Sequence, residues 1–191
     1  MKRFAFAMGI LGLAVSLAGA QASTLAVDPA HSEVGFGIRH AGLSTVRGHF
    51  SNVKGTILLD DANISRSSVN VTIDVTTVDT GNSARDNHLK TDAFFDVAHF
   101  PTATFVSTSV SRNGSRLAVA GNLTLRGVTK PVTLDVETGG AMDNPQDHKK
   151  HIGYSATTTI KRLDFGIGTN FGAAMLGEDV PLTIDLEAVK Q

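Results

Sequence analysis

The feature that most constrains this chain is an alternation of apolar and polar residues with a period of two. Between residues 69 and 76 every odd position is valine or isoleucine and every even position is polar, and related alternations return at residues 34–38, 117–125, 132–136 and 180–186. Successive side chains of a β-strand point to opposite faces of its sheet. These segments therefore predict strands that each have one apolar face and one polar face.

Turn-forming residues separate the predicted strands. Asp, Asn and Gly gather at residues 60–63 and 112–115, and a longer polar loop runs through residues 139–150. These residue types favour the backbone conformations that turns require. Short strands at regular spacing with turns between them are typical of an all-β protein, so we expect an antiparallel barrel or sandwich of eight or nine strands.

One stretch interrupts the strand pattern. Residues 83–90 predict a short helix with Ser83 as the N-cap residue, and Thr91 is expected to cap a second short helix that carries Phe94 and Phe95. In an all-β chain, we expect this helical segment to cover one end of the barrel as a lid.

The first 22 residues have the pattern of a cleavable secretory signal. Two basic residues precede an apolar run from Phe4 to Leu17, and Ala20 and Ala22 supply small side chains before a cut at Ser23. The run is shorter than the ~20 apolar residues of a membrane anchor. We therefore expect a signal peptide over residues 1–22, a single domain over residues 23–191, and a periplasmic location for the mature protein.

The composition excludes several classes of function. The formal net charge is −1, and removal of Lys2 and Arg3 with the signal lowers it to −3. No basic excess remains to attract nucleic acid or an anionic membrane surface. The chain contains no cysteine, so it forms no disulfide. It also lacks a second long apolar run, so we expect no stable insertion into a membrane.

The pattern alone leaves open whether the barrel is filled or hollow. The chain contains ten Phe, one Tyr and no Trp, while the inward positions of the strands are mainly Val, Ile and Leu. Side chains of this size can leave an elongated apolar pocket at the centre of a small barrel. The same stripes also fit an ordinary core, and a glycine inside a strand is more often a bulge.

Several motifs follow one another in a recognisable order across residues 24–189. They are Asp28-Pro29-Ala30-His31-Ser32 with Ile38-Arg39-His40, Gly48-His49-Phe50, the segment 85–96 with Pro101, Phe105-Val106-Ser107-Thr108, the segment 121–131, Arg162-Leu163-Asp164-Phe165-Gly166 and Gly177-Glu178-Asp179-Val180. Together they resemble the YceI-like family, the polyisoprenoid-binding proteins of the periplasm.

The resemblance implies a lipocalin-like, extended antiparallel barrel of eight strands with a short helical lid. It also implies a tunnel for one amphiphilic chain, such as a polyprenyl phosphate, an isoprenoid quinone or a fatty-acid derivative, held for transport, storage or a stress response. No cofactor is expected beyond the bound lipid. A homodimer through an exposed barrel face is compatible with the sequence, but no motif signals it.

The residues expected to line such a tunnel are inward-phase apolar residues, joined by the two lid phenylalanines and by apolar residues of the glycine-rich loop 168–177. They are Phe36, Ile38, Val71, Ile73, Phe94, Phe95, Phe105, Leu123, Leu125, Phe165, Ile167, Phe171, Met175 and Leu176. Met175 suits a flexible lipid contact. Plain core packing is the alternative for each of these residues.

Four polar residues are candidates for contact with a lipid head group: Arg39, His40, Arg85 and Arg162. Each also has an alternative role. For Arg39 it is ordinary solvation at the protein surface. His40 falls on the apolar phase of its strand, as a satisfied core histidine would. Arg85 with Asp86, and Arg162 with Asp164, would form ion pairs that fix the lid and the last hairpin.

No catalytic or metal site is predicted. His148 and His151 are an i,i+3 pair in a polar loop, but zinc needs three or four ligands. The chain has neither a Gly-x-Ser-x-Gly nor a His-Glu-x-x-His motif. The sequence therefore predicts a lipid-binding protein that is not an enzyme. The alternative is an enzyme that acts on an isoprenoid or small substrate through His40 and His88.

Overall fold

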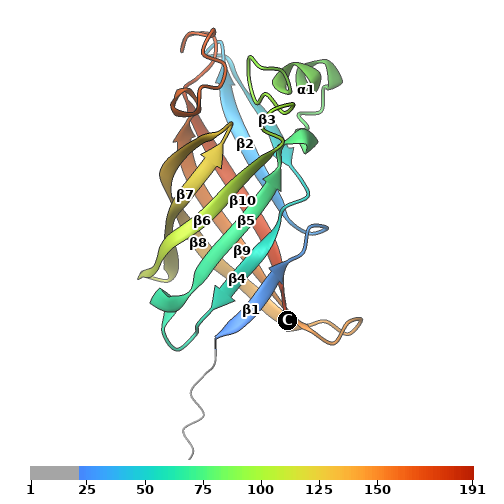
Figure 1. The fold of residues 1–191 in the computed structure, drawn as a ribbon, viewed down its shortest axis with the longest axis vertical. Helices are drawn as coiled ribbons and strands as arrows, with labels where there is room; N and C mark the ends of the chain where they lie inside the picture. Colours follow the sequence, from blue (N-terminus) through green and yellow to red (C-terminus); the bar gives the residue numbers. More distant parts are fainter. Residues whose placement is uncertain (1–21) are drawn as a thin grey trace, which may run out of the picture.

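The computed structural model describes residues 22–191, which form an antiparallel β-barrel elongated along one axis (Figure 1). All of the predicted signal peptide except Ala22 lies outside the described residues. The strands are β1 (Ser23–Val27), β2 (Glu33–His40), β3 (Ser44–Phe50), β4 (Lys54–Leu59), β5 (Ser68–Asp74), β6 (Thr102–Asn113), β7 (Arg116–Leu125), β8 (Val128–Asp143), β9 (Lys150–Lys161) and β10 (Asp179–Lys190).

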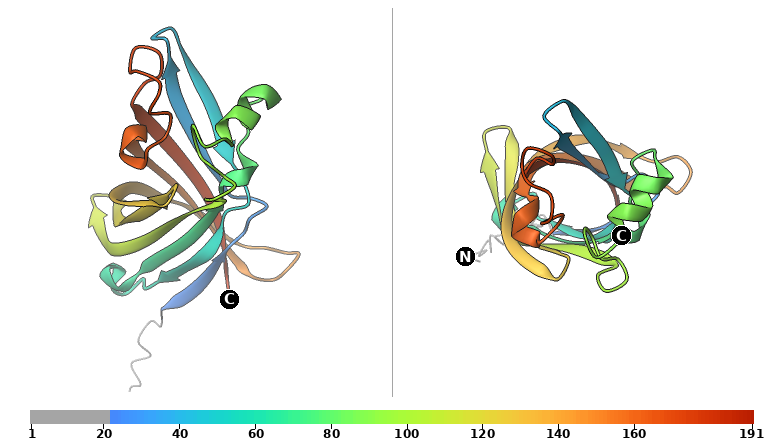
Figure 2. Two further views of the ribbon diagram at one scale, coloured as in Figure 1. Left: turned by 45° about the horizontal axis from the view of Figure 1, so that its top comes forward. Right: turned by 90° about the horizontal axis from the view of Figure 1, so that it is seen from above.

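Eight of these strands form a closed ring. Their order is β1-β4-β5-β6-β7-β8-β9-β10, and the pairing of β1 with β10 closes it. The view along the barrel axis shows this ring end on (Figure 2). The predicted eight-stranded antiparallel barrel is confirmed, and the hairpin of β2 and β3 is an addition to the ring.

Strand β10 pairs with both β1 and β2 along one edge. Its last residues pair with β1, as in Leu25↔Lys190, and its middle residues pair with β2, as in Phe36↔Leu182. The turn at residues 28–32 therefore lies beside β10 at the point where the pairing of β10 changes from β1 to β2. The hairpin also contacts the connection that follows β5, through the isolated bridge His49↔Asp79.

Helix α1 lies at the end of the barrel away from the C-terminus (Figure 1). Helix α1 spans Ser83–Leu89, as predicted, but its N-cap is Asn82, whose side chain accepts a hydrogen bond from the Arg85 amide. The second helix expected after Thr91 is absent, because the chain there makes hydrogen-bonded turns such as Phe94 N to Thr91 O. Residues 22–191 also contain three 3₁₀-helices: η1 (Ile64–Arg66), η2 (Val75–Thr77) and η3 (Arg162–Phe165).

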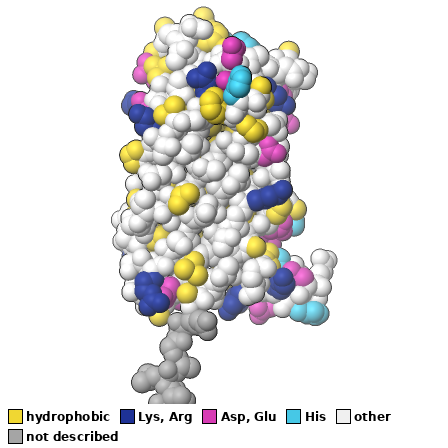
Figure 3. All heavy atoms as spheres, viewed as in Figure 1, with side chains coloured by type: hydrophobic (Ala, Val, Ile, Leu, Met, Phe, Trp, Pro, Cys, Tyr) yellow, Lys and Arg dark blue, Asp and Glu magenta, His cyan; other side chains and the backbone are white. Residues whose placement is uncertain are grey.

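The two faces of the wall differ as the alternation predicts. The buried residues are mainly Val, Ile, Leu and Phe of the inward phase. On the face seen in Figure 3, most charged side chains lie towards the two ends, and the middle of the wall is largely uncharged. No helix within residues 22–191 is both long and apolar enough to span a bilayer.

Candidate functional site

The barrel encloses a cavity of about 180 Å³ in its interior. Twenty-seven of the described residues line it, and only two of these, Thr158 and Arg162, are not apolar. They come from the hairpin β2–β3 and the connection after it, from strands β5 to β10, from η2 and η3, from the lid and from the loop that precedes β10. The cavity is therefore built by the closure of the ring, because its walls come from segments far apart in the sequence.

A second cavity of about 70 Å³ continues towards the other end of the barrel. It shares four lining residues with the first: Val69, Leu134, Ile184 and Leu186. Tyr154 lines this smaller cavity and is 9 % exposed, and within residues 22–191 its hydroxyl has no hydrogen-bond partner. Burial raises the pKa of Tyr154 to about 12, with a smaller contribution from Asp61. Together the two cavities form an elongated apolar interior.

The lid, residues 83–95, and the flap, residues 166–178, meet over one end of the main cavity. The Gly168 amide donates to Ala93 O at 2.9 Å, and the rings of Phe94 and Phe171 stack with centroids 5.4 Å apart. Gly168 has a φ of +59°, and a Cβ there would lie 3.0 Å from the Phe94 ring. The close approach of the flap to the lid therefore requires glycine at this position.

Arg162 holds the flap in place through hydrogen bonds from its guanidinium group. Its side chain is buried, and its guanidinium donates to five carbonyl oxygens of the flap, those of Ile167, Gly168, Phe171, Leu176 and Gly177, at 2.6–3.0 Å. Burial lowers the pKa of Arg162. All five N–H groups of a guanidinium are satisfied by such a set. The side chain is thus a structural anchor whose hydrogen-bonding capacity is already used.

The sequence model of one protein family, the YceI-like domain, matches residues 25–188 of this chain. The chain belongs to the YceI-like family.

Relatives and solved structures agree with this assignment. The protein YceI of Salmonella arizonae is 41% identical over 193 residues, which cover 100% of both chains. The YceI protein of Campylobacter jejuni has a solved structure that is 34% identical, with a TM-score of 0.71 over 80% of this chain and 90% of the other. A polyisoprenoid-binding domain from Saccharophagus degradans, 17% identical, shares the fold with a TM-score of 0.64 over 90% of this chain and 100% of the other.

Most of the apolar residues singled out from the sequence of this YceI-like chain lie around the main cavity. These are Phe36, Ile38, Val71, Ile73, Phe94, Phe95, Phe105, Leu123, Leu125, Ile167 and Leu176. Three others do not line it. Phe165 is buried at 1 % exposure in the core, Phe171 stacks on the outer side of Phe94, and Met175 is 51 % exposed. Phe165 lies in the 3₁₀-helix η3 and the other two lie in the flap, so a period of two does not assign them a direction.

The four polar candidates are not brought together. Arg39 and His40 are exposed at the end of β2, where Arg39 donates to Thr45 Oγ1 and Gly42 O. Arg85 donates to the hydroxyl and carbonyl of Thr80. Only Arg162 lines the cavity.

Two expected structural roles of these residues are wrong. Within residues 22–191, neither Arg85 nor Arg162 forms an ion pair, since both guanidinium groups bond to neutral oxygen atoms. His40 is not a core histidine, because its strand has left the barrel wall at that point and its side chain is exposed.

Sequence reasoning missed cavity residues that its own pattern contained. Val180, Leu182, Ile184 and Leu186 of β10 all line the cavity, as do Val132 and Leu134 of β8. Their alternation with polar residues is evident in the sequence. Assigning every second residue of each strand to the barrel interior would have identified them. Phe50 carried no such signal. Its ring packs tilted against Phe36 and edge-on against Phe95, because the hairpin and the lid meet in space.

Proposed function

We propose that this protein binds the long apolar chain of a lipid of the polyisoprenoid class in its barrel, and carries or stores that lipid in the periplasm without chemical change. The observation that carries the proposal is the lining of the main cavity, in which 25 of 27 side chains are apolar. A site of this kind offers no set of polar groups for a compact polar substrate. An elongated hydrocarbon chain matches it.

Hydrocarbon burial supplies enough free energy for such binding. Each buried CH₂ group contributes about 0.8 kcal/mol, so about ten of them offset the roughly 8 kcal/mol of a micromolar complex. Among residues 22–191, Arg162 is the only charged side chain at the cavity, and its donors are already engaged by the flap. We therefore expect the tail to dominate affinity and the head group to stay near the lid.

Two further observations support the ligand class and the compartment. The Saccharophagus degradans domain that shares this fold is described as polyisoprenoid-binding. The pattern of the first 22 residues is that of an export signal. A polyprenyl phosphate, an isoprenoid quinone and a long acyl chain all satisfy the chemistry of the cavity.

The arrangement of the two candidate catalytic histidines favours binding over turnover. His40 is exposed at the end of β2, while the ring of His88 packs edge-on against Phe94 at 5.0 Å. Within residues 22–191 neither imidazole is hydrogen-bonded to a carboxylate, so neither has the orienting partner that a general base commonly uses.

Native mass spectrometry of the exported protein tests the proposal, together with organic extraction of what it carries. We expect one prenyl, quinone or acyl chain per barrel, unchanged in mass after long incubation; the same spectrum reports whether the protein is a monomer or a dimer. Turnover of the chain would instead support the enzyme alternative. If no chain is extracted and an added long-chain polyprenol does not bind, the proposal is wrong.

A matched pair of variants locates the bound chain. Leu134 lines both cavities, and its neighbour Thr133 is exposed on the outer face of β8. Leu134→Trp fills the junction of the cavities and should abolish retention of the chain, whereas Thr133→Trp should retain it. Equal retention by the two folded variants would place the lipid outside the barrel.

A further inference from the structure

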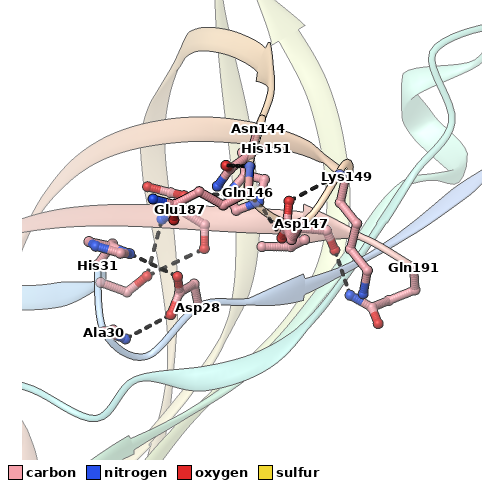
Figure 4. Close-up of polar contacts among 12 residues, drawn as sticks. Asp28, Ala30, His31, Asn144, Gln146, Asp147, Lys149, His151, Glu187 and Gln191 are labelled. Carbon is pink, nitrogen blue, oxygen red and sulfur yellow. Dashed lines mark hydrogen bonds and ion pairs between the residues drawn. The ribbon is translucent and has the colours of Figure 1, made fainter.

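A cluster of imidazole and carboxylate groups lies on the outside of the barrel, near the end that carries the C-terminus. One side-chain ligand atom each from Asp28, His31 and Glu187 lies within 4.8 Å of the other two. Asp28 and His31 belong to the turn between β1 and β2, and Glu187 belongs to β10 (Figure 4). None of the three lines the lipid cavity, so the cluster is separate from the proposed lipid site.

The backbone holds the two parts of the cluster together. The Asp28 amide donates to Glu187 O at 2.8 Å, and the Ser32 hydroxyl accepts from the Glu187 amide at 3.1 Å. Ser32 is buried at 6 % exposure. The turn and the strand thus meet in a fixed relation, and the three side chains do not depend on a flexible loop for their approach.

His151 orients the carboxylate of Glu187 from the other side. Its Nδ1 lies 2.5 Å from Glu187 Oε1 and its Nε2 lies 2.9 Å from Asp147 Oδ2. The His151 side chain is 10 % exposed, whereas that of His31 is 66 % exposed. The first imidazole is therefore a buried support, and the second is accessible to solutes.

The charges of the cluster favour a cation. Three carboxylates, those of Asp28, Asp147 and Glu187, face two imidazoles, and within residues 22–191 no lysine or arginine is paired with any of the three. Imidazole and carboxylate together suit first-row transition metals, whereas Mg²⁺ and Ca²⁺ prefer oxygen atoms alone.

We propose that Asp28, His31 and Glu187 bind one divalent transition-metal ion of the Zn²⁺ type, with His151 as the positioning residue of Glu187. Metal–ligand bonds of about 2.0–2.2 Å place tetrahedral ligands roughly 3.4 Å apart. The observed spacing is compatible with this value, because Asp28 Oδ2 and His31 Nδ1 are 2.8 Å apart and all three ligand atoms lie within 4.8 Å of one another. Small side-chain rotations therefore complete the site, and a water molecule fills the fourth position. The ion fastens the turn 28–32 to β10.

The chain provides a matched control for this proposal. Asp96 and His99 form a second Asp-x-x-His pair, with His99 Nδ1 again 2.8 Å from the Asp96 carboxylate and with similar exposure. No third His or carboxylate of the described chain completes that pair within ligand distance. The two pairs differ in the third ligand, so the His99→Ala variant separates a built site from generic binding by a histidine next to an aspartate.

The experiment is zinc titration of the untagged, chelator-treated protein by calorimetry, with thermal unfolding followed in parallel. We expect one Zn²⁺ per chain and a higher Tm for the wild type and for His99→Ala. His31→Ala and Asp28→Asn should bind at least about tenfold more weakly and lose the shift in Tm. The asparagine side chain of the Asp28→Asn variant retains the oxygen that caps the Ala30 amide, so we expect this variant to keep the fold of the turn.

Anomalous scattering at the zinc edge from a zinc-loaded crystal would place the ion between the turn and β10. Binding by His31→Ala as tight as that of the wild type would overturn the proposal, as would equal losses in His31→Ala and His99→Ala. Binding of Ca²⁺ as tight as that of Zn²⁺ would contradict an imidazole ligand. Each result is independent of whether a lipid is extracted from the barrel.

Discussion

Replacement of Arg162 by methionine is expected to destabilise the protein by releasing the flap. Methionine keeps an apolar stem of similar length in the wall of the cavity, so the change removes mainly the guanidinium. Five flap carbonyls lose their donor. Within the described chain, only Gly168 O among these accepts another backbone N–H, that of Phe171.

The magnitude follows from the four carbonyls that are left unpaired. Each carbonyl left without a donor costs about 1 kcal/mol, which gives about 4 kcal/mol for the four. The variant no longer buries a charged group, which recovers part of this cost, and we expect a net loss of about 3 kcal/mol. A domain of this size loses about 2–4 °C in Tm per kcal/mol, so the Tm should fall by about 6–12 °C.

Urea unfolding and hydrogen exchange of residues 166–178 measure the effect. Arg162→Lys keeps the charge but offers three donors instead of five, so its stability should lie between those of the wild type and Arg162→Met. Arg112→Met is the control, because Arg112 is exposed on β6 and makes no side-chain hydrogen bond within residues 22–191. If Arg162→Met and Arg112→Met differ by less than about 0.5 kcal/mol, the flap does not depend on the guanidinium.

The barrel interior supports two further predictions, one about Gly121 and one about Tyr154. A Cβ on Gly121 would meet the Phe105 ring and Val106 O, so Gly121→Ala should lower the free energy of unfolding by about 1–3 kcal/mol and weaken lipid retention. Gly140→Ala is the control, because a Cβ there meets nothing within 4 Å and should leave the stability unchanged. Urea unfolding of the two variants measures the difference. Tyr154 is the only tyrosine, so ultraviolet absorbance reports its ionisation directly, and the native midpoint should lie at about 12 rather than 10.0. Because the pKa of Tyr154 is raised in the folded state, burial of the neutral phenol contributes its full stabilisation below pH 10.0, and this stabilisation is lost as the pH rises towards 12. A midpoint near 10 in the native protein would show that the phenol is solvated.

The barrel could be predicted from the sequence because its determinants are local. A period of two in segments such as 69–76 and 180–186 requires one apolar face in each strand, and turn residues separate the strands. The number of strands was harder to predict, because β1 contains only five residues and β2 with β3 lies beside the ring. The double pairing of β10 with β1 and β2 depends on contacts between the two ends of the chain, which no local pattern encodes.

The polar interactions were predicted less well, since their partners are backbone atoms. Arg162 and Asp164 are close in the sequence and opposite in charge, so an ion pair was the natural expectation. In the structure the flap surrounds the guanidinium with carbonyl oxygens, whose positions depend on the fold of residues 167–177. Side-chain charges are visible in a sequence, whereas backbone acceptors are not, so buried arginines are easily assigned the wrong partner.

The cavity itself lies between these two cases. The inward residues Val71, Ile73, Leu123 and Leu125 have the same identities whether they fill a core or surround a space. What decides is the circumference of the ring, because eight strands set a radius that side chains of this size do not fill along the whole axis. Gly121 shows how closely the wall is adjusted, since the Phe105 ring packs over a position where a methyl group would displace it. A hollow barrel therefore follows from strand number and side-chain volume together, and neither is specified by the alternation alone.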